Sequence, residues 1–346
     1  MRSVTMSGLI GRILQGERLA ISKAISLIEN TLPEKRLEAR DLLCGLLKAS
    51  KAAPPKMRIG ISGPPGVGKS TFIDALGNHL LVGLGKSIAV LAVDPSSSLT
   101  GGSLLGDKTR MPRLSTHPRA FVRPSPAAGS LGGVTRTTAE ALCVVEAGGA
   151  DVTILETVGV GQSETAVEGL VDTFVLLCSP GGGDELQGLK KGVVELADVI
   201  VVNKTDGDTV AIAQRTRNEY AGAIRLIHCK NSAWKPPVLN CSARAEKGVA
   251  EVWQAIVDHH NCLVSTGQLE QRRSLQRVQH MWGDVHCQLL DLIHRDPDLN
   301  RLSRAVEDSV VHLEMTSGEA ADRIMASFHQ STARLPQYSR TREQQS

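Results

Sequence analysis

Residues 63–71 read Gly63-Pro64-Pro65-Gly66-Val67-Gly68-Lys69-Ser70-Thr71 and directly follow the apolar run Met57–Ser62. A glycine, four residues and then Gly-Lys-Ser is the signature of a phosphate-binding loop that joins a buried strand to a helix. The glycines allow successive backbone N–H groups to point at an anion, and the dipole of the following helix adds positive charge. In such a loop Lys69 reaches the β- and γ-phosphates, Ser70 binds Mg²⁺, and Thr71 lies near the α-phosphate. The sequence therefore predicts a nucleotide-binding protein.

A second motif, Asn203-Lys204-Thr205-Asp206, follows the apolar run Val199–Val202. The Asp206 carboxylate can accept hydrogen bonds from both N1–H and the N2 amino group of guanine, whereas adenine has no such pair of donors. We expect Asn203 to hold the loop and approach N7, and the aliphatic stem of Lys204 to pack on the base. Combined with the phosphate-binding loop, this motif predicts guanine specificity.

The segment Ser242-Ala243-Arg244 follows a further apolar run, Val238–Cys241. Ligands of open parallel sheets bind beyond the carboxyl ends of the strands, so this segment is expected to face the same nucleotide. We expect a backbone donor at Ser242 or Ala243 to read guanine O6, and we include Arg244 in the base-binding set.

Three acidic residues are candidate ligands of a magnesium ion, together with Ser70. Asp94 closes the run Ser87–Val93, Asp107 lies in the glycine-rich segment 101–110, and Glu156 ends the run Asp151–Leu155. Mg²⁺ keeps several waters and takes one or two carboxylates, so we expect a mixture of direct and water-mediated contacts. Asp94 could instead cap only the turn that follows it.

The segment Glu156-Thr157-Val158-Gly159-Val160-Gly161-Gln162 occupies the place where many GTPases carry Asp-x-x-Gly. Gly159 suits a loop whose N–H binds the γ-phosphate and releases it after hydrolysis. In-line attack of water on that phosphate needs charge neutralisation and an oriented nucleophile. The candidate catalytic residues are Lys69, Glu156 and Gln162, with the choice between Gln162 and Glu156 as the water-orienting group left open.

Short apolar runs separated by helical patterns predict a largely parallel, doubly wound α/β sheet. The expected strands are Met57–Ser62, Ser87–Val93, Ala120–Arg123, Asp151–Glu156, Asp172–Cys178, Val199–Val202 and Val238–Cys241. Helical spacing from Leu9 to Ser50, broken at Leu32-Pro33, predicts an N-terminal helical arm. Further helices are expected over Val249–Val264, Leu269–His294, Leu299–Leu313 and Ser317–Phe328. We predict an arm and linker in 1–55, a nucleotide domain in 56–265, a helical extension in 266–332 and a disordered tail in 333–346.

The composition excludes several classes of partner. The 346 residues carry 39 Lys and Arg against 36 Asp and Glu, and only 3% are aromatic, which argues against a nucleic-acid or membrane surface. The 7 cysteines form no Cys-x-x-Cys pair and are expected to be reduced. Without a membrane-spanning run or a signal peptide, we expect a cytoplasmic protein, although a short organelle leader stays open.

Four longer stretches resemble the MeaB/ArgK family, which includes the methylmalonic aciduria type A protein. They are Asp94-Pro95-Ser96-Ser97-Ser98, Gly106-Asp107-Lys108-Thr109-Arg110-Met111, Glu156-Thr157-Val158-Gly159-Val160-Gly161-Gln162-Ser163-Glu164 and Gly183-Asp184-Glu185-Leu186-Gln187-Gly188. The resemblance extends from the N-terminal arm through the C-terminal helices. Members of this family are G-protein chaperones of adenosylcobalamin-dependent methylmalonyl-CoA mutase.

The resemblance implies a SIMIBI-type P-loop GTPase, related to the signal-recognition and nickel-insertion GTPases, that works as a homodimer through its C-terminal helices. It implies that Asp94, Asp107 and Glu156 occupy magnesium and switch positions, and that 180–192 form a third switch. GTP hydrolysis would gate the loading and protection of methylmalonyl-CoA mutase, or of a relative such as isobutyryl-CoA mutase. Adenosylcobalamin would be bound by that partner rather than by this chain.

Two alternatives remain from the sequence. A nickel-insertion GTPase shares the sheet and the phosphate-binding loop but needs metal ligands, and the histidines here lie on helices without a His-rich arm. A kinase of amino-acid transport proteins needs an acceptor pocket with a base, for which the chain shows no motif.

Overall fold

The computed structural model describes residues 6–30, 32–50, 54–94, 110–126, 131–157, 163–181, 191–227 and 233–334. The chain forms two compact units, residues 1–280 and residues 281–346. The first unit holds the sheet with its covering helices, and the second is helical. The four-part division suggested by the sequence stays a prediction.

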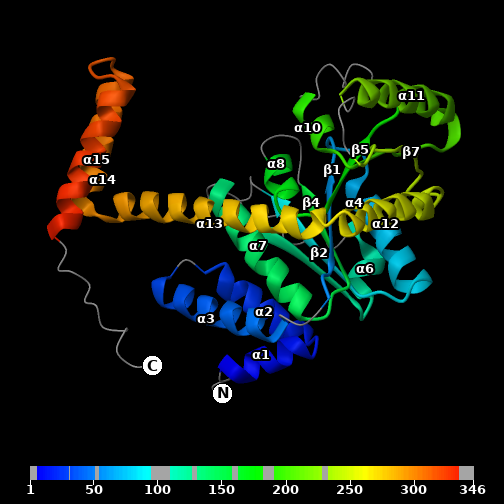
Figure 1. Cartoon of the computed structure of the whole chain (residues 1–346), viewed down its shortest axis with the longest axis horizontal. Helices are drawn as coiled ribbons and strands as arrows, with labels where there is room; N and C mark the ends of the chain where they lie inside the picture. Colours follow the sequence, from blue (N-terminus) through cyan, green and yellow to red (C-terminus); the bar gives the residue numbers. More distant parts are fainter. Residues whose placement is uncertain are drawn as a thin grey trace. The chain divides into compact units, whose positions relative to one another are not determined.

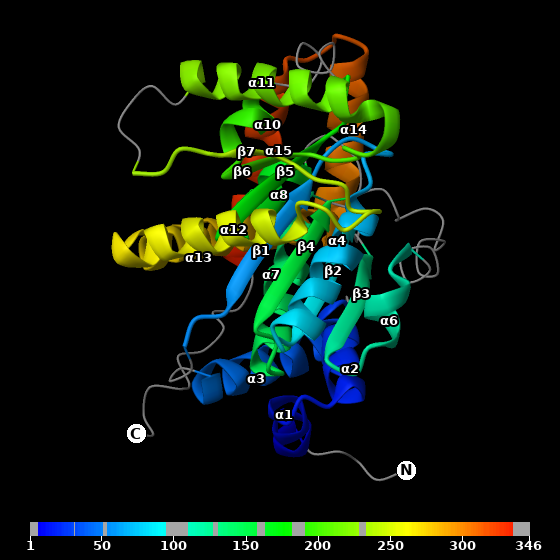
Figure 2. The same ribbon diagram turned by 90° about the vertical axis from the view of Figure 1, so that its right-hand side faces the viewer.

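Seven parallel strands form one sheet in the order β3-β2-β4-β1-β5-β6-β7 (Figures 1 and 2). Their bounds are β1 Met57–Ser62, β2 Ile88–Asp94, β3 Ala120–Pro126, β4 Val152–Thr157, β5 Thr173–Cys178, β6 Val199–Val202 and β7 Val238–Asn240. Every predicted strand is present, because strands buried on both faces of a parallel sheet are continuous apolar runs. The doubly wound α/β fold class is therefore confirmed.

Alternate residues of each strand enter two separate hydrophobic cores, since successive side chains point to opposite faces. On β5, Phe174 and Leu176 belong to one core, and Val175 and Leu177 belong to the other. One face is covered by α1 (Met6–Leu14), α2 (Arg18–Ile28), α3 (Pro33–Ser50), α7 (Leu131–Ala147), α8 (Ser163–Glu168), α10 (Lys191–Leu196) and α11 (Val210–Ile227). The other is covered by α4 (Lys69–Asn78), the π-helical turn η1 (His79–Gly83), α6 (Pro112–Thr116) and α12 (Val249–Ser265). Figures 1 and 2 show the sheet between these two layers.

Three aspartates at the amino edge of the sheet each lie directly before a strand and bind the strand beside it. Asp151 accepts from Ser87 N at 2.9 Å, Asp172 from Arg58 N at 2.9 Å, and Asp198 from Phe174 N at 2.8 Å. These contacts satisfy N–H groups where the strands begin, which would otherwise be costly to bury. We call Asp151, Asp172 and Asp198 the amino-edge aspartates.

The remaining helices are α13 (Gln268–Arg295), α14 (Pro297–Val311) and α15 (Ser317–Arg334). α14 starts where Asp296 caps it by accepting from the N–H groups of Asp298 and Leu299, with Pro297 at the first helical position. α15 continues to Arg334 rather than ending at the predicted Phe328. The residues 335–346 of the predicted tail lie outside the described part of the chain.

The N-terminal arm contains a break that helical spacing does not predict. α1 and α2 are separate helices, and Gly16 between them has φ +75°, a left-handed conformation that favours glycine. The break at Leu32-Pro33 is confirmed by the start of α3. Within the described residues, none of the helices combines the length and hydrophobicity needed to cross a bilayer.

Candidate nucleotide-binding site

The predicted motifs follow strands whose carboxyl ends meet at one edge of the sheet. The phosphate-binding loop follows β1, which pairs in parallel with β4 and β5, while the guanine motif follows β6 and residues 242–244 follow β7. Thr157 at the end of β4 donates a hydrogen bond from its hydroxyl to the Ser62 hydroxyl at 2.9 Å. The ends of these strands, where the motif loops begin, are thus joined by side chains as well as by the sheet.

Glycine is required at two places in the phosphate-binding loop. A Cβ at Gly63 would lie 2.4 Å from the backbone oxygen of Leu177, and Gly63 also has φ +153°. At Gly68, with φ +95°, a Cβ would lie 2.9 Å from Asn203 Nδ2. Val67 between them is fully buried in the core beneath the loop. The turn therefore packs too closely on its neighbours to accept side chains at Gly63 and Gly68.

Lys69 begins α4 and folds back over the loop. Its Nζ donates to the backbone oxygens of Gly63 at 2.7 Å and Pro64 at 3.2 Å. Burial, the largest influence, lowers the pKa of Lys69, and the carboxylates of Glu156 and Glu164 oppose that shift. The ammonium group is thus held in front of the loop by groups that a phosphate could replace.

Ser70 and Glu156 come together as the proposed magnesium ligands require. Ser70 Oγ donates to Glu156 Oε1 at 2.8 Å, and Glu156 is 4% exposed at the end of β4. A hydroxyl and a carboxylate at this separation are the hard oxygen ligands that Mg²⁺ takes, with water completing its shell. The donor set therefore fits a magnesium ion at the start of α4, although binding of Mg²⁺ by these residues stays a prediction.

Asn203 joins three loops that are far apart in the sequence. Its Nδ2 donates to Val67 O at 2.9 Å in the phosphate-binding loop, and its Oδ1 accepts from Ala243 N at 3.1 Å. The side chain is only 2% exposed. The Ala243 N–H, one of the donors expected at guanine O6, is therefore bonded to Asn203 in this structure.

Residues 203–209, which follow β6 and are called the base loop, are held in place around Asp206. Ser242 Oγ donates to Asp206 Oδ1 at 2.7 Å and accepts from Ala245 N at 3.2 Å. Thr209, in the 3₁₀ turn η3 (Gly207–Thr209), donates from its hydroxyl to Asp206 O at 2.7 Å. Lys204 is exposed and has φ +59°, an uncommon conformation for a residue with a side chain. The Ser242 contact fixes the orientation of the Asp206 carboxylate.

Sequence reasoning missed a bridge between α4 and the turn after β7. Asp74 of α4 accepts from Arg113 Nε at 2.8 Å and from Leu114 N at 3.2 Å, and Arg113 also forms an ion pair with Glu246. The residues of the bridge are separated in the sequence and follow no local pattern. Only the buried position of Asp74 in an otherwise apolar helix face hints at a partner.

The remaining predicted residues are distributed as follows. Pro65, Gly66 and Thr71 are exposed around the phosphate-binding loop, and Arg244 is exposed in the turn after β7. Asp94 ends β2 at the same edge of the sheet, but its side chain lies outside the described residues, as do Asp107, Gly159 and Gln162. The roles assigned to the site residues stay predictions.

The chain is similar to known proteins of one family. The family model described as methylmalonyl Co-A mutase-associated GTPase MeaB matches residues 21–298. The chain is 42% identical to the mitochondrial methylmalonic aciduria type A homolog of Mus musculus over 323 residues, covering 91% of this chain and 78% of the relative. It is also 42% identical to the GTPase ArgK of Escherichia coli K12 over 304 residues, covering 88% and 91% of the two chains.

A solved structure supports the same assignment. The crystal structure of a protein named LAO/AO transport system kinase superposes with a TM-score of 0.74 at 33% sequence identity, covering 95% of this chain and 99% of that one. The family match spans the phosphate-binding loop, the base loop and the first helices after them. The chain therefore belongs to the MeaB family of methylmalonyl-CoA mutase-associated GTPases.

Proposed function

We propose that this GTPase binds guanine nucleotide with Mg²⁺ at the carboxyl edge of its sheet and gates the loading and protection of a cobalamin-dependent mutase. The observation that carries the nucleotide site is the Asn203 contact, because one buried side chain ties the phosphate-binding loop to the loop after β7. The mutase partner is supported by the family description and by the mouse relative named for methylmalonic aciduria. Adenosylcobalamin would be held by the partner.

The residues of the site divide the chemistry between them. Lys69 would leave the carbonyls of Gly63 and Pro64 to neutralise charge on the γ-phosphate during in-line attack by water. Ser70 and Glu156 would hold the magnesium ion, which would supply positive charge to neutralise the phosphates. Glu156 or Gln162 would orient the water, directly or through the metal shell.

We expect Asp206→Asn to weaken GTP binding about 10- to 100-fold and to shift preference towards xanthosine triphosphate. The amide would place a donor opposite the guanine donors, whereas xanthine offers a carbonyl at that position. Competition for a fluorescent nucleotide measures the change. Asp208→Asn, an exposed residue two positions away, is the matched control. Unaltered GTP preference in Asp206→Asn would rule out this reading of the base loop.

We also propose that the protein is a homodimer that pairs through its C-terminal helices. Met281, Trp282, Val285 and Leu289 of α13 are 51%, 55%, 36% and 42% exposed. At 3.6 residues per turn these side chains share one face of the helix. Exposed apolar residues on an ordinary protein surface are scattered, whereas these four form a stripe along one helix. The stripe therefore supports burial of this face against a second copy of the chain.

The dimer predicts a clear hydrodynamic result. Wild-type protein should sediment as a dimer, and Trp282→Asp should sediment as a monomer because it places a charge in the apolar stripe. His294→Asp adds the same charge on the opposite face of α13 and should leave the dimer intact. A monomeric wild-type protein, or a dimeric Trp282→Asp variant, would exclude this interface.

The two alternative functions have direct tests. For nickel insertion, the described residues hold no group of three or more His, Cys, Asp and Glu side chains placed to bind a metal ion, and a nickel titration decides the matter. For a kinase, the relevant neighbour is the protein named LAO/AO transport system kinase. Hydrolysis of GTP labelled at the γ-phosphate, in the presence of candidate acceptor proteins, should release all label as inorganic phosphate.

Affinity capture tests the proposed partner. Immobilised protein loaded with a non-hydrolysable GTP analogue or with GDP is mixed with purified methylmalonyl-CoA mutase and its cobalamin. We expect capture that depends on the nucleotide, and the Lys69→Ala variant serves as the control that cannot be loaded. Equal absence of the mutase from both loaded forms would contradict the chaperone proposal and leave the GTPase assignment intact.

A further inference from the structure

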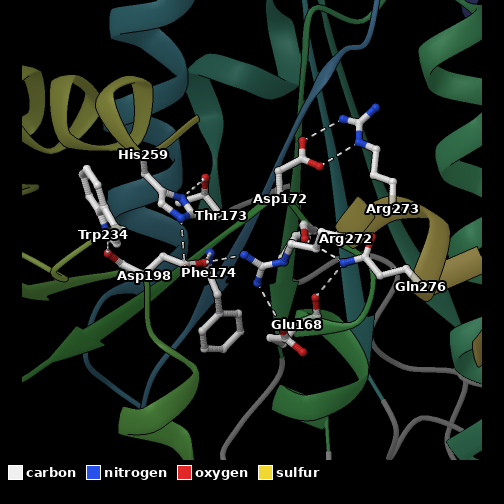
Figure 3. Close-up of polar contacts among 11 residues, drawn as sticks. Glu168, Asp172, Thr173, Phe174, Asp198, Trp234, His259, Arg272, Arg273 and Gln276 are labelled. Atoms are coloured by element: carbon white, nitrogen blue, oxygen red, sulfur yellow. Dashed lines mark hydrogen bonds and ion pairs between the residues drawn. The ribbon is translucent and has the colours of Figure 1, made fainter. Parts of the chain in front are cut away.

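A second polar cluster lies at the amino edge of the sheet, opposite the nucleotide site (Figure 3). The first turns of α13 bind two of the amino-edge aspartates there. Arg273 donates to Asp172 from Nε at 2.8 Å and from Nη2 at 2.7 Å, and Arg272 Nη1 lies 3.4 Å from Asp198 Oδ2. The nucleotide chemistry described above uses none of these residues.

The same stretch of α13 holds the end of α8. Arg272 Nη2 donates to Glu168 Oε1 at 2.8 Å. One turn further on, Gln276 Nε2 donates to Val171 O at 2.9 Å and to Glu168 O at 3.3 Å. The last carbonyls of a helix lack partners within it, so Gln276 caps α8 from another helix. Arg272 and Gln276 are four residues apart and therefore lie on one face of α13.

Arg272 thus bridges two acids from different parts of the unit. Asp198 is fixed to the sheet, because it binds Phe174 N, accepts from Trp234 Nε1 at its backbone oxygen at 2.8 Å, and lies 3.4 Å from His259 Nε2. Burial lowers the pKa of His259 to about 4, so at neutral pH this histidine is an uncharged partner. Glu168, in contrast, belongs to α8. Arg272 therefore joins α8 to the amino edge of the sheet.

The other end of α8 lies at the nucleotide site. Glu164, in its first turn, is fully buried, and its carboxylate acts electrostatically on Lys69. Glu168 is four positions after Glu164, which is about 6 Å along the helix axis. Between them α8 packs tightly on β1, because a Cβ at Gly60 would lie 3.0 Å from Val167 Cγ1. One short helix thus connects the phosphate-binding lysine to α13.

We propose that α8 couples the nucleotide site to α13, so that the Arg272–Glu168 contact differs in strength between the GTP-bound and GDP-bound protein. The proposal rests on the proposed nucleotide site. It adds a route by which the exchange of GTP for GDP at that site would affect α13, the helix that continues into the second unit. By thermodynamic linkage, the effect of the nucleotide on the Arg272–Glu168 contact equals the effect of that contact on nucleotide affinity. If the contact is stronger with one nucleotide, removing the contact must change the relative affinity for the two nucleotides by the same factor.

The test compares dissociation constants for a non-hydrolysable GTP analogue and for GDP in matched variants. Arg272→Gln and Glu168→Gln should each change the ratio of the two constants by at least about fivefold, and the double variant should change it no further. Arg272→Lys keeps the charge and should stay closer to wild type. Arg277→Gln is the matched control on the same helix, since Arg277 pairs with the exposed Glu270 and should change the ratio by less than about twofold.

Hydrogen exchange of residues 268–280 is a second measurement. If the Arg272–Glu168 contact had only a structural role, protection of this segment would not depend on the nucleotide. Wild-type protection should differ between the analogue and GDP, and the difference should be lost in Arg272→Gln and Glu168→Gln. Equal protection of the wild-type segment with both nucleotides, or an unchanged ratio of constants in folded variants that bind both, overturns the coupling. Failure of wild-type protein to bind either nucleotide contradicts the proposed site itself.

Discussion

Replacing Lys69 with alanine is expected to weaken GTP binding at least about 100-fold and to lower the rate of hydrolysis about 10²- to 10³-fold. Lys69 is the cation that faces the phosphate-binding loop, and the buried carboxylates of Glu156 and Glu164 act on it electrostatically. Without the ammonium group, these carboxylates would repel a polyphosphate. The loss should therefore be larger than that of one hydrogen bond.

The Lys69→Ala variant is measured by nucleotide titration and by single-turnover release of phosphate. Lys48→Ala, an exposed residue of α3, is the control and should match wild type. Thermal unfolding without nucleotide should show that both variants are folded at the temperature of the titration, so that lost binding is not lost folding. Wild-type affinity in Lys69→Ala would mean that the loop does not bind the phosphates.

Replacing Arg273 with methionine is expected to lower the free energy of unfolding by about 3–5 kcal/mol, because it leaves a buried charge without its partner. Asp172 is fully buried, Arg273 is 8% exposed at its side chain, and the two share a two-point contact. Asp172 also accepts from Arg58 N, so its carboxylate cannot turn towards water without breaking the start of β1. Denaturant unfolding measures the change.

Two further variants separate the lost ion pair from lost packing. Adding Asp172→Asn to Arg273→Met removes the remaining buried charge, so the double variant should be more stable than Arg273→Met alone. Arg277→Met, one turn along the same helix, removes only an exposed pair and should change stability by less than about 0.5 kcal/mol. Equal stability of Arg273→Met and wild type would show that α13 is not held at the amino edge.

The sheet could be predicted from the sequence because each of its strands is buried on both faces. Runs such as Val199–Val202 and Asp172–Cys178 need no long-range information to be recognised. The end of β3 was not predicted correctly from the sequence. The strand continues through Pro124 to Pro126, and proline is unusual inside a strand. The arm was predicted as helical, but the periodicity continues across Gly16 and hides the break between α1 and α2.

The candidate site also has a part that could be predicted from the sequence and a part that could not. The phosphate-binding loop and the base loop are local motifs, so their residues were predictable, and the buried strands explain why they meet at one edge. The contacts that hold the site together are not local. Arg113 meets Glu246 across 133 positions, and Arg272 meets Glu168 across 104. In its local sequence each of these residues resembles an ordinary solvated charge. Their pairing could therefore not be predicted without the fold.

The function proposed for this protein depends on binding of guanine nucleotide, with magnesium, at the carboxyl edge of the sheet. Isothermal titration calorimetry of the purified protein tests it most directly, with GTP, GDP and ATP each added in the presence of Mg²⁺. We expect saturable binding of one GTP or GDP per chain, no binding of ATP, and loss of GTP binding in Lys69→Ala. Absence of binding heat with both guanine nucleotides, or equal binding of ATP, would contradict it.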